Sequence, residues 1–299
     1  MIEAIANVND VDIAYQLHGE SGLPVLLLIS GLSTPLSGWP TDMVQRFVDA
    51  GFQVLLFDNR DMGKSQLLDQ LKIPHFVWTV LKIKWGFRGG IPYQLEDMMQ
   101  DTVALLDHLK FEKVHVVGAS MGGMIAQLLA IHYGERVESL TSIMSTTGYN
   151  KLPPIEPKIR QQLLLKPASK SHEDRMAYHI NKWCVIGSPA YPASKEYLQG
   201  YVAAMLERGI TAKGTIRQLL AIMAAKNRTP LLHAIKVPSL VLHGDCDGLI
   251  NVAGGEATAN AITNAQLKIY PGMGHDFPQA LVPTMVQDIV QFIHKNQQA

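Results

Sequence analysis

The chain of 299 residues carries 26 basic and 26 acidic side chains, so its formal net charge at pH 7 is zero. This balance argues against nucleic acid or an acidic surface as a partner of the whole chain. Apolar residues make up 47% and charged residues 17% of the chain, a globular composition with enough material for one large core.

The chain start and the cysteine content bear on location. MIEAIANVND lacks the basic and apolar regions of a signal peptide. The two cysteines, Cys184 and Cys246, are too few for a disulfide framework. The longest apolar runs have strand length, well short of the ~20 residues of a membrane span. We therefore expect a cytoplasmic protein without stable membrane insertion, and we expect Cys246 to be a small buried filler.

Strand and helix patterns alternate along the chain. Short apolar runs are typical of strands buried on both faces of a parallel sheet. The expected strands begin with VDIAYQLHG and continue at 24–30, 52–58, 114–118, 137–145, 238–244 and 265–272. Helical periodicity falls at 94–109, after Ser120, at 252–262 and at 281–293. The alternation predicts an α/β fold with a doubly wound, mostly parallel sheet flanked by helices.

Two long stretches interrupt this rhythm. After MSTTG comes the proline-rich YNKLPPIEPK, followed by helical patterns without a buried-strand run. We expect a helical cap at 148–230, inserted into a core domain made of residues 1–147 and 231–299. The second stretch, 73–93, is rich in aromatic residues and too long for an ordinary connection.

The segment FVWTVLKIKWGFR (76–88) within that second stretch mixes four aromatic residues with Lys82, Lys84 and Arg88. Two interpretations are open. We favour a second lid segment whose aromatic side chains pack on the cap. The alternative is docking at a lipid surface, for which basic and aromatic residues on one helix are typical.

The sequence VVGASMGGMIAQ (116–127) places Ser120 where a strand pattern turns into a helix pattern. Gly118 to Gly122 matches G-x-S-x-G, and the strand-to-helix context is that of a nucleophile elbow. Such a turn holds the serine in strained backbone and requires glycine two positions to either side. The helix amino terminus favours negative charge at the site. We predict that Ser120 is a nucleophile; the simpler alternative is a glycine-rich turn without chemistry.

A base and an acid are expected further along the chain. His275 lies in YPGMGHDFP, a loop directly after the last expected strand, which opens at the same sheet edge as Ser120. A neutral imidazole there could take the serine proton and later protonate the leaving group. Other histidines, including His108, His132 and His294, lie in helical patterns and are expected at the surface.

The acid has two candidates in VLHGDCDGLI (241–250), Asp245 and Asp247. Either carboxylate could hold the imidazole of His275 in one tautomer and stabilise the imidazolium that forms. We favour Asp247, because it lies further past the strand end and can reach His275. Asp245 then serves the turn through the backbone.

The order Ser, Asp, His in these contexts resembles the α/β-hydrolases, from Asp10 to about residue 295. SGLSTPLSGWP, FDNRDMGKS and VVGASMGGMIAQLLA resemble the carboxylesterase group that includes aclacinomycin methylesterase-like enzymes. The resemblance implies the α/β-hydrolase fold with an inserted cap. It also implies a catalytic triad of Ser120, Asp247 and His275.

Acyl transfer also needs hydrogen-bond donors for the oxyanion. In this superfamily they are backbone N–H groups, which carry over to Met121 after the nucleophile and to Leu32 after PVLLLIS. Many relatives have His-Gly where this chain has Ser30-Gly31, so Ser30 either braces the loop or only ends the strand.

The stretch FDNRDMGKS (57–65) resembles the D-x-R-G-x-G-x-S loop of the superfamily, with Asp61 in place of the first glycine. We interpret Asp58 and Arg60 as structural residues that brace loops near the site.

These residues predict a serine carboxylesterase that hydrolyses small to medium esters through an acyl-enzyme. Lactonase, thioesterase, perhydrolase, C–C hydrolase and iminopeptidase activities stay open, as do a slow-turnover ligand receptor and an idle interaction protein. An iminopeptidase would need cap carboxylates, for which Glu173 and Asp174 are available. We expect a small-molecule ester as partner and neither metal nor cofactor. Formation of a homodimer stays an open alternative.

Overall fold

A computed structural model of the chain describes residues 1–297. Its eight strands form one sheet in the order β1-β2-β4-β3-β5-β6-β7-β8. The first two strands pair antiparallel with their neighbours, and all later pairs are parallel. The strands are β1 (Ile2–Val8), β2 (Val11–His18), β3 (Val25–Ile29), β4 (Gln53–Phe57), β5 (Val114–Ala119), β6 (Val137–Ile143), β7 (Ser239–Gly244) and β8 (Gln266–Tyr270).

The strands from β2 onward were predicted, whereas β1 was not. β1 is an edge strand with most of its side chains exposed, so it lacks the continuous apolar run of the buried strands. Asn9 and Asp10, both at positive φ, form the turn that joins it to β2. Two successive residues of this conformation are typical of a two-residue hairpin turn.

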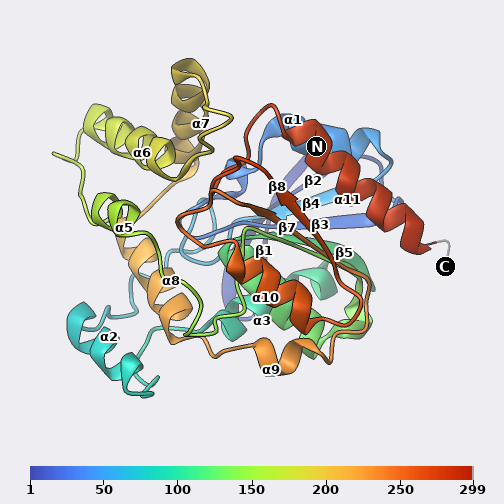
Figure 1. Cartoon of the computed structure of the whole chain (residues 1–299), viewed down its shortest axis with the longest axis horizontal. Helices are drawn as coiled ribbons and strands as arrows, with labels where there is room; N and C mark the ends of the chain where they lie inside the picture. The colour runs from blue at the N-terminus through green and yellow to red at the C-terminus, as the bar shows by residue number, and fades with distance from the viewer. Residues whose placement is uncertain (298–299) are drawn as a thin grey trace.

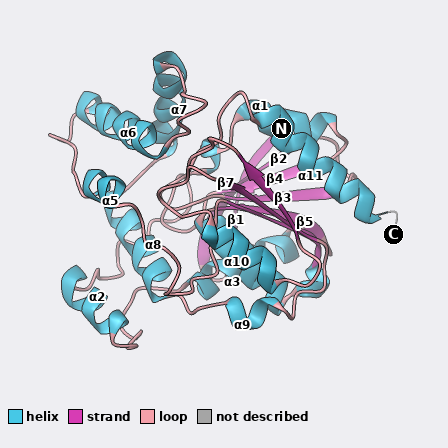
Figure 2. Cartoon of the chain, viewed as in Figure 1, coloured by secondary structure: helices cyan, strands magenta, loops and turns pink. Residues whose placement is uncertain are grey.

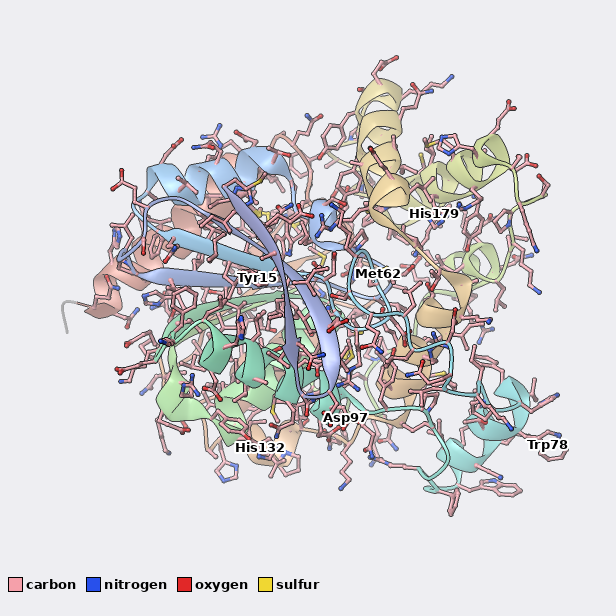
Figure 3. The ribbon with its side chains drawn as sticks, turned by 180° about the vertical axis from the view of Figure 1, so that it is seen from behind. Tyr15, Met62, Trp78, Asp97, His132 and His179 are labelled. Atoms are coloured by element: carbon pink, nitrogen blue, oxygen red, sulfur yellow. The ribbon has the colours of Figure 1, made fainter. Side chains whose placement is uncertain are left out.

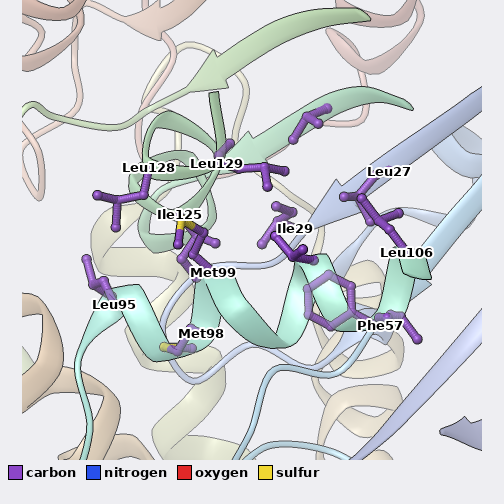
Figure 4. Close-up of a cluster of buried hydrophobic side chains, with 14 of the residues drawn as sticks. Leu27, Ile29, Phe57, Leu95, Met98, Met99, Leu106, Ile125, Leu128 and Leu129 are labelled. Carbon is purple, nitrogen blue, oxygen red and sulfur yellow. The ribbon is translucent and has the colours of Figure 1, made fainter. Parts of the chain in front are cut away.

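Helices cover both faces of the sheet (Figure 1). One face carries α1 (Thr41–Asp49) and α11 (Val282–Gln297), and the other carries α3 (Leu95–His108), α4 (Met121–His132) and α10 (Ala253–Ala261). Figure 4 shows the apolar side chains of α3 and α4 meeting those of β3 and β4. The predicted doubly wound α/β fold is confirmed.

A helical insertion follows β6. It contains α5 (Pro157–Leu163), α6 (His172–Ile186), α7 (Lys195–Arg208), α8 (Ala212–Ala224) and the short α9 (Thr229–Leu232). No strand occurs between β6 and β7, a stretch that lies wholly within the described residues (Figure 2). α9 contacts α4 and α10 of the core. The predicted inserted cap is therefore present as α5–α8; its expected limits, 148 and 230, stay a prediction.

Buried ion pairs fasten the insertion to the loop after β4. Arg217 on α8 donates two hydrogen bonds to the fully buried Asp61, at 2.8 and 2.6 Å. Arg208 on α7 donates to Asp58 at 2.8 Å. Asp58 also accepts the backbone N–H groups of Leu36 and Lys64, so its expected bracing role is confirmed.

We expect Arg217→Met to lower the free energy of unfolding by about 3–5 kcal/mol, because it leaves the buried carboxylate of Asp61 without its partner. Urea unfolding measures this loss. Arg46→Met is the matched control, since the Arg46–Asp42 pair is exposed on α1 and should contribute less than about 1 kcal/mol. Equal losses in the two variants would contradict a role for the buried pair.

The segment 76–88 differs from the favoured expectation. It contains α2 (Phe76–Lys84), which lies beside α8, and Thr79 is buried there. Three of its four aromatic side chains point outward: Trp78 is 63%, Trp85 83% and Phe87 60% exposed, whereas Phe76 is 38% exposed. The expected packing on the cap is therefore wrong for these three side chains, although α2 itself contacts α8 of the insertion.

Two further observations concern the surface. No helix within residues 1–297 is long and apolar enough to cross a membrane. Cys246, expected to be buried, is exposed, because it lies in the loop beyond β7 with its side chain outside the core.

Candidate active site

The turn between β5 and α4 holds Ser120 at φ 56° and ψ −118°. This positive φ is strained for a residue with a side chain. A Cβ atom at Gly118 would lie 2.2 Å from the Gly122 carbonyl oxygen, and one at Gly122 would lie 1.9 Å from the Ile29 carbonyl oxygen. Only glycine fits these two positions. The local sequence therefore folds into the sharp turn that the pattern predicted and presents Ser120 at the carboxyl edge of the sheet.

Three predicted side chains meet at this edge. The Nε2 atom of His275 lies 3.0 Å from Ser120 Oγ, and its Nδ1 atom lies 2.7 Å from Asp247 Oδ2. His275 comes from the loop after β8, and Asp247 from the loop after β7. Both are buried. The geometry allows a proton to pass from the hydroxyl to an imidazole that a carboxylate orients.

Asp247 is held by several donors at once. Its Oδ1 accepts the backbone N–H groups of Leu249 and Ile250, each at 2.9 Å. Burial by itself would raise the pKa of Asp247. The charge of His275, together with the hydrogen bonds and charge of His243, instead lowers that pKa well below its ordinary value. The carboxylate therefore stays ionised across the neutral range.

His243 is a neighbour that sequence reasoning missed. It is fully buried on β7, and its Nε2 atom lies 3.3 Å from Asp247 Oδ2 and 2.8 Å from the Ile250 carbonyl oxygen. Its position four residues before Asp247, at the end of a buried strand, was the available signal.

The other candidate acid lies elsewhere. Asp245 is exposed and accepts the backbone N–H of Gly272 at 2.6 Å, which ties the loop after β7 to the loop after β8. The structure thus brings Asp247, and not Asp245, to His275. The expected turn role of Asp245 through its own backbone is wrong, since its carboxylate bonds to the loop after β8.

The predicted oxyanion donors flank Ser120. Met121 begins α4 directly after the serine. A Cβ atom at Gly31 would lie 3.2 Å from Ser120 Cβ, so the Gly31–Leu32 backbone passes next to Ser120. Neither the Met121 nor the Leu32 N–H donates a hydrogen bond within residues 1–297. Both amides are therefore available to an oxygen atom at the serine.

Residues from other segments hold the loop that carries Leu32 in place. The hydroxyl of Ser30, considered as a brace, is buried without a hydrogen-bond partner in the described part of the chain. Asn59 instead donates to the Ser30 carbonyl at 3.1 Å, and Gln218 on α8 accepts the Ser33 N–H at 3.0 Å. Gln218 also donates to the Arg60 carbonyl at 2.9 Å. The inserted helix α8 thus holds the loop of Gly31–Ser33 through a buried glutamine.

We expect Gln218→Met to lower kcat for an ester by about 10- to 100-fold with little change in KM, because Ser33 loses its acceptor and the donor at Leu32 shifts. Steady-state kinetics separates the two parameters. Gln199→Met, at an exposed position on α7, should leave both parameters unchanged. A Gln218 variant with wild-type kcat would show that the loop holds its shape alone.

The cap also contacts the histidine loop. His275 donates its backbone N–H to the Ile186 carbonyl at 2.7 Å, and Gly274 donates to Ser188 Oγ at 2.8 Å. Ser188 in turn donates to Asp276. The loop of Gly31–Ser33 and the loop of His275 are therefore both fastened to the inserted segment.

A cavity of about 500 Å³ lies beside the histidine loop. Its walls come from α6, α7 and the loops after β7 and β8, and they include Trp183, Tyr197, Tyr201, Asp276 and Phe277. The volume falls in the range of small-molecule pockets. Within residues 1–297, no three His, Cys, Asp or Glu side chains gather as a metal site requires.

Known proteins resemble this chain over most of its length. The profile of the family described as "Serine aminopeptidase, S33" matches residues 24–279. Rhodomycin D methylesterase DnrP of Streptomyces peucetius is 24% identical, with 86% of each chain covered. 3-Oxoadipate enol-lactonase 2 of Acinetobacter baylyi is 27% identical, over 87% of this chain and 85% of that protein.

Solved structures share the fold. A putative lipase from Acinetobacter baumannii superposes with a TM-score of 0.77 at 22% identity, covering 99% of this chain and 92% of that chain. The enol-lactonase from Burkholderia xenovorans gives a TM-score of 0.70 at 22% identity, covering 97% of this chain and all of the other.

Proposed function

The chain belongs to the serine aminopeptidase S33 family of α/β-hydrolases, and from this premise we propose that it is a serine carboxylesterase acting on small to medium carboxylic esters. The observation that carries the proposal is the continuous hydrogen-bonded series from Ser120 through His275 to Asp247. The relatives named as a methylesterase and an enol-lactonase support ester bonds as the target.

Acylation begins with attack of Ser120 Oγ on the ester carbonyl carbon. His275 Nε2 takes the hydroxyl proton as the new C–O bond forms. The negative charge that develops on the carbonyl oxygen is stabilised by the N–H groups of Met121 and Leu32. The imidazolium then gives its proton to the alkoxide that leaves, and the acyl group stays on the serine.

Deacylation uses the same groups with water as the nucleophile. His275 takes a proton from water, and the hydroxyl oxygen attacks the acyl carbon. Collapse of the second tetrahedral intermediate breaks the bond to Ser120 Oγ, which regains a proton from the imidazolium. Asp247 stays ionised throughout and stabilises the imidazolium in both halves of the reaction.

The cavity supports this substrate class. Asp276 and Phe277, which directly follow His275 in the chain, line it, whereas Ser120 and His275 do not. Aromatic and other apolar side chains dominate its wall, and its volume suits a small or medium acyl or alcohol group. We propose that α5–α8 act as a cap over this space, consistent with the contacts that the cap makes to both catalytic loops.

Hydrolysis of p-nitrophenyl esters from acetate to laurate tests the proposal. We expect turnover with an optimum at short or medium acyl chains, because longer chains exceed the cavity. No turnover by the folded protein on any of these esters would overturn the carboxylesterase proposal and favour lactones, C–C bonds or the receptor interpretation.

A second candidate, an aminopeptidase, has one observation in its favour. The carboxylate of Asp276 lines the cavity next to His275, and no Lys or Arg of the described residues pairs with it. A carboxylate so placed could bind a substrate ammonium group. The cap carboxylates considered from the sequence do not line the cavity. Amino-acid p-nitroanilides assayed beside the esters separate the two functions.

A further inference from the structure

The outer side of α2 is apolar although it faces solvent. At 100° per residue, the side chains of Val77, Trp78, Leu81 and Trp85 fall on one side of the helix, and all four are exposed. Thr79, on the opposite side, is buried. Figure 3 shows Trp78 pointing away from the rest of the molecule. Val80 and Ile83 on the inner side are half-buried, so α2 has apolar side chains on both sides and leaves one of them uncovered, unlike an ordinary surface helix.

Basic side chains border this apolar side. Lys82 and Lys84 lie on its two flanks at helical spacing, and Arg88 follows the helix. Residues 70–95 contain no Asp or Glu. None of the three cations forms an ion pair within residues 1–297, and Lys82 lies 5.9 Å from the centre of the Phe87 ring. The segment is thus locally cationic in a chain of zero net charge.

We propose that the α2 face, defined as Val77, Trp78, Leu81, Lys82, Lys84 and Trp85, docks on an anionic lipid bilayer. The tryptophans enter the headgroup region, where amphipathic rings bind well, and the lysines contact the lipid phosphates. A polybasic segment beside apolar anchors is the pattern that negative lipid surfaces attract.

The local composition favours this occupant. Exposed tryptophans flanked by lysines, with no acidic residue in 70–95, match both the apolar and the anionic layer of a bilayer surface. The nine residues of α2 cannot cross a bilayer, so the contact is peripheral. The proposal is independent of the esterase proposal, because no residue of the α2 face belongs to the candidate active site.

Co-sedimentation with vesicles tests the proposal directly. We expect the full chain to bind vesicles of phosphatidylcholine mixed with phosphatidylglycerol, and to bind pure phosphatidylcholine much more weakly. The affinity should fall as salt is added, because ionic screening weakens the lysine contacts. Failure of the wild-type protein to bind the anionic vesicles would overturn the proposal.

Paired variants locate the binding surface. We expect Trp78→Ala with Trp85→Ala to weaken binding about tenfold or more, and Lys82→Gln with Lys84→Gln to weaken it about fivefold for each lysine. Leu164→Ala, at an exposed position beyond α5, and Lys113→Gln are the matched controls and should bind as wild type. An unchanged melting temperature of every variant reports that the fold is intact.

Two further outcomes would contradict the proposal. Vesicle binding that both paired variants retain would overturn the proposal. Sedimentation velocity showing a dimer that Trp78→Ala with Trp85→Ala dissociates, in a protein that ignores vesicles, would assign the face to a second copy instead.

Discussion

Replacement of Ser120 by alanine should abolish ester hydrolysis, lowering kcat by about 10⁴- to 10⁶-fold. The serine oxygen forms the covalent bond of the acyl-enzyme, so no other group in the site can substitute for it. The oxyanion donors at Met121 and Leu32 remain in the variant and account for any residual rate above that of water. Initial rates on p-nitrophenyl esters measure the loss.

Two controls accompany this variant, one for its fold and one for the replacement of a serine elsewhere in the chain. The Ser120→Ala protein should have the melting temperature of the wild type within a few degrees, since only one oxygen atom is removed. Ser169→Ala, which changes an exposed serine of the insertion, should hydrolyse esters at the wild-type rate. Full activity in Ser120→Ala would contradict the assignment of the nucleophile.

Replacement of Asp247 by asparagine should lower kcat by about 10⁴-fold. The neutral amide cannot stabilise the imidazolium, and it can hold His275 in the tautomer that carries its proton on Nε2. That tautomer cannot accept the proton of Ser120. Steady-state kinetics of the purified variant, compared with the wild type at neutral pH, measures the effect.

Asp245→Asn provides the matched comparison, two residues away in the same loop. Its carboxylate is exposed and accepts the Gly272 N–H, a bond that the asparagine carbonyl can retain. We expect kcat to change by less than about twofold. A large loss in Asp245→Asn with little loss in Asp247→Asn would reverse the choice of acid.

Much of the fold and the candidate site could be predicted because the relevant information is local in the sequence. Runs such as VLLLI mark strands that are buried on both faces. Gly118 and Gly122 are required because a Cβ atom at either position would clash with the backbone, and both lie within two residues of Ser120. His275 and Asp247 each follow a predicted strand, and parallel strands bring their carboxyl ends to one edge.

The remaining features depend on contacts between distant residues. Gln218 accepts a hydrogen bond from Ser33, which lies 185 residues earlier, and in the sequence it is an ordinary polar residue of a helix. The orientation of α2 was also hidden, because periodicity identifies the apolar side of a helix but not whether another element covers it. Exposure of Cys246 depends on the path of one loop.

Labelling with a fluorophosphonate, followed by peptide mass spectrometry, tests the central claim most directly. The reagent forms a stable bond to a serine that a neighbouring base activates. We predict one adduct per chain, on the peptide that contains Ser120, with loss of esterase activity in proportion to labelling. Sustained ester hydrolysis by a protein that carries no adduct at Ser120, or that carries it on another residue, would contradict the account.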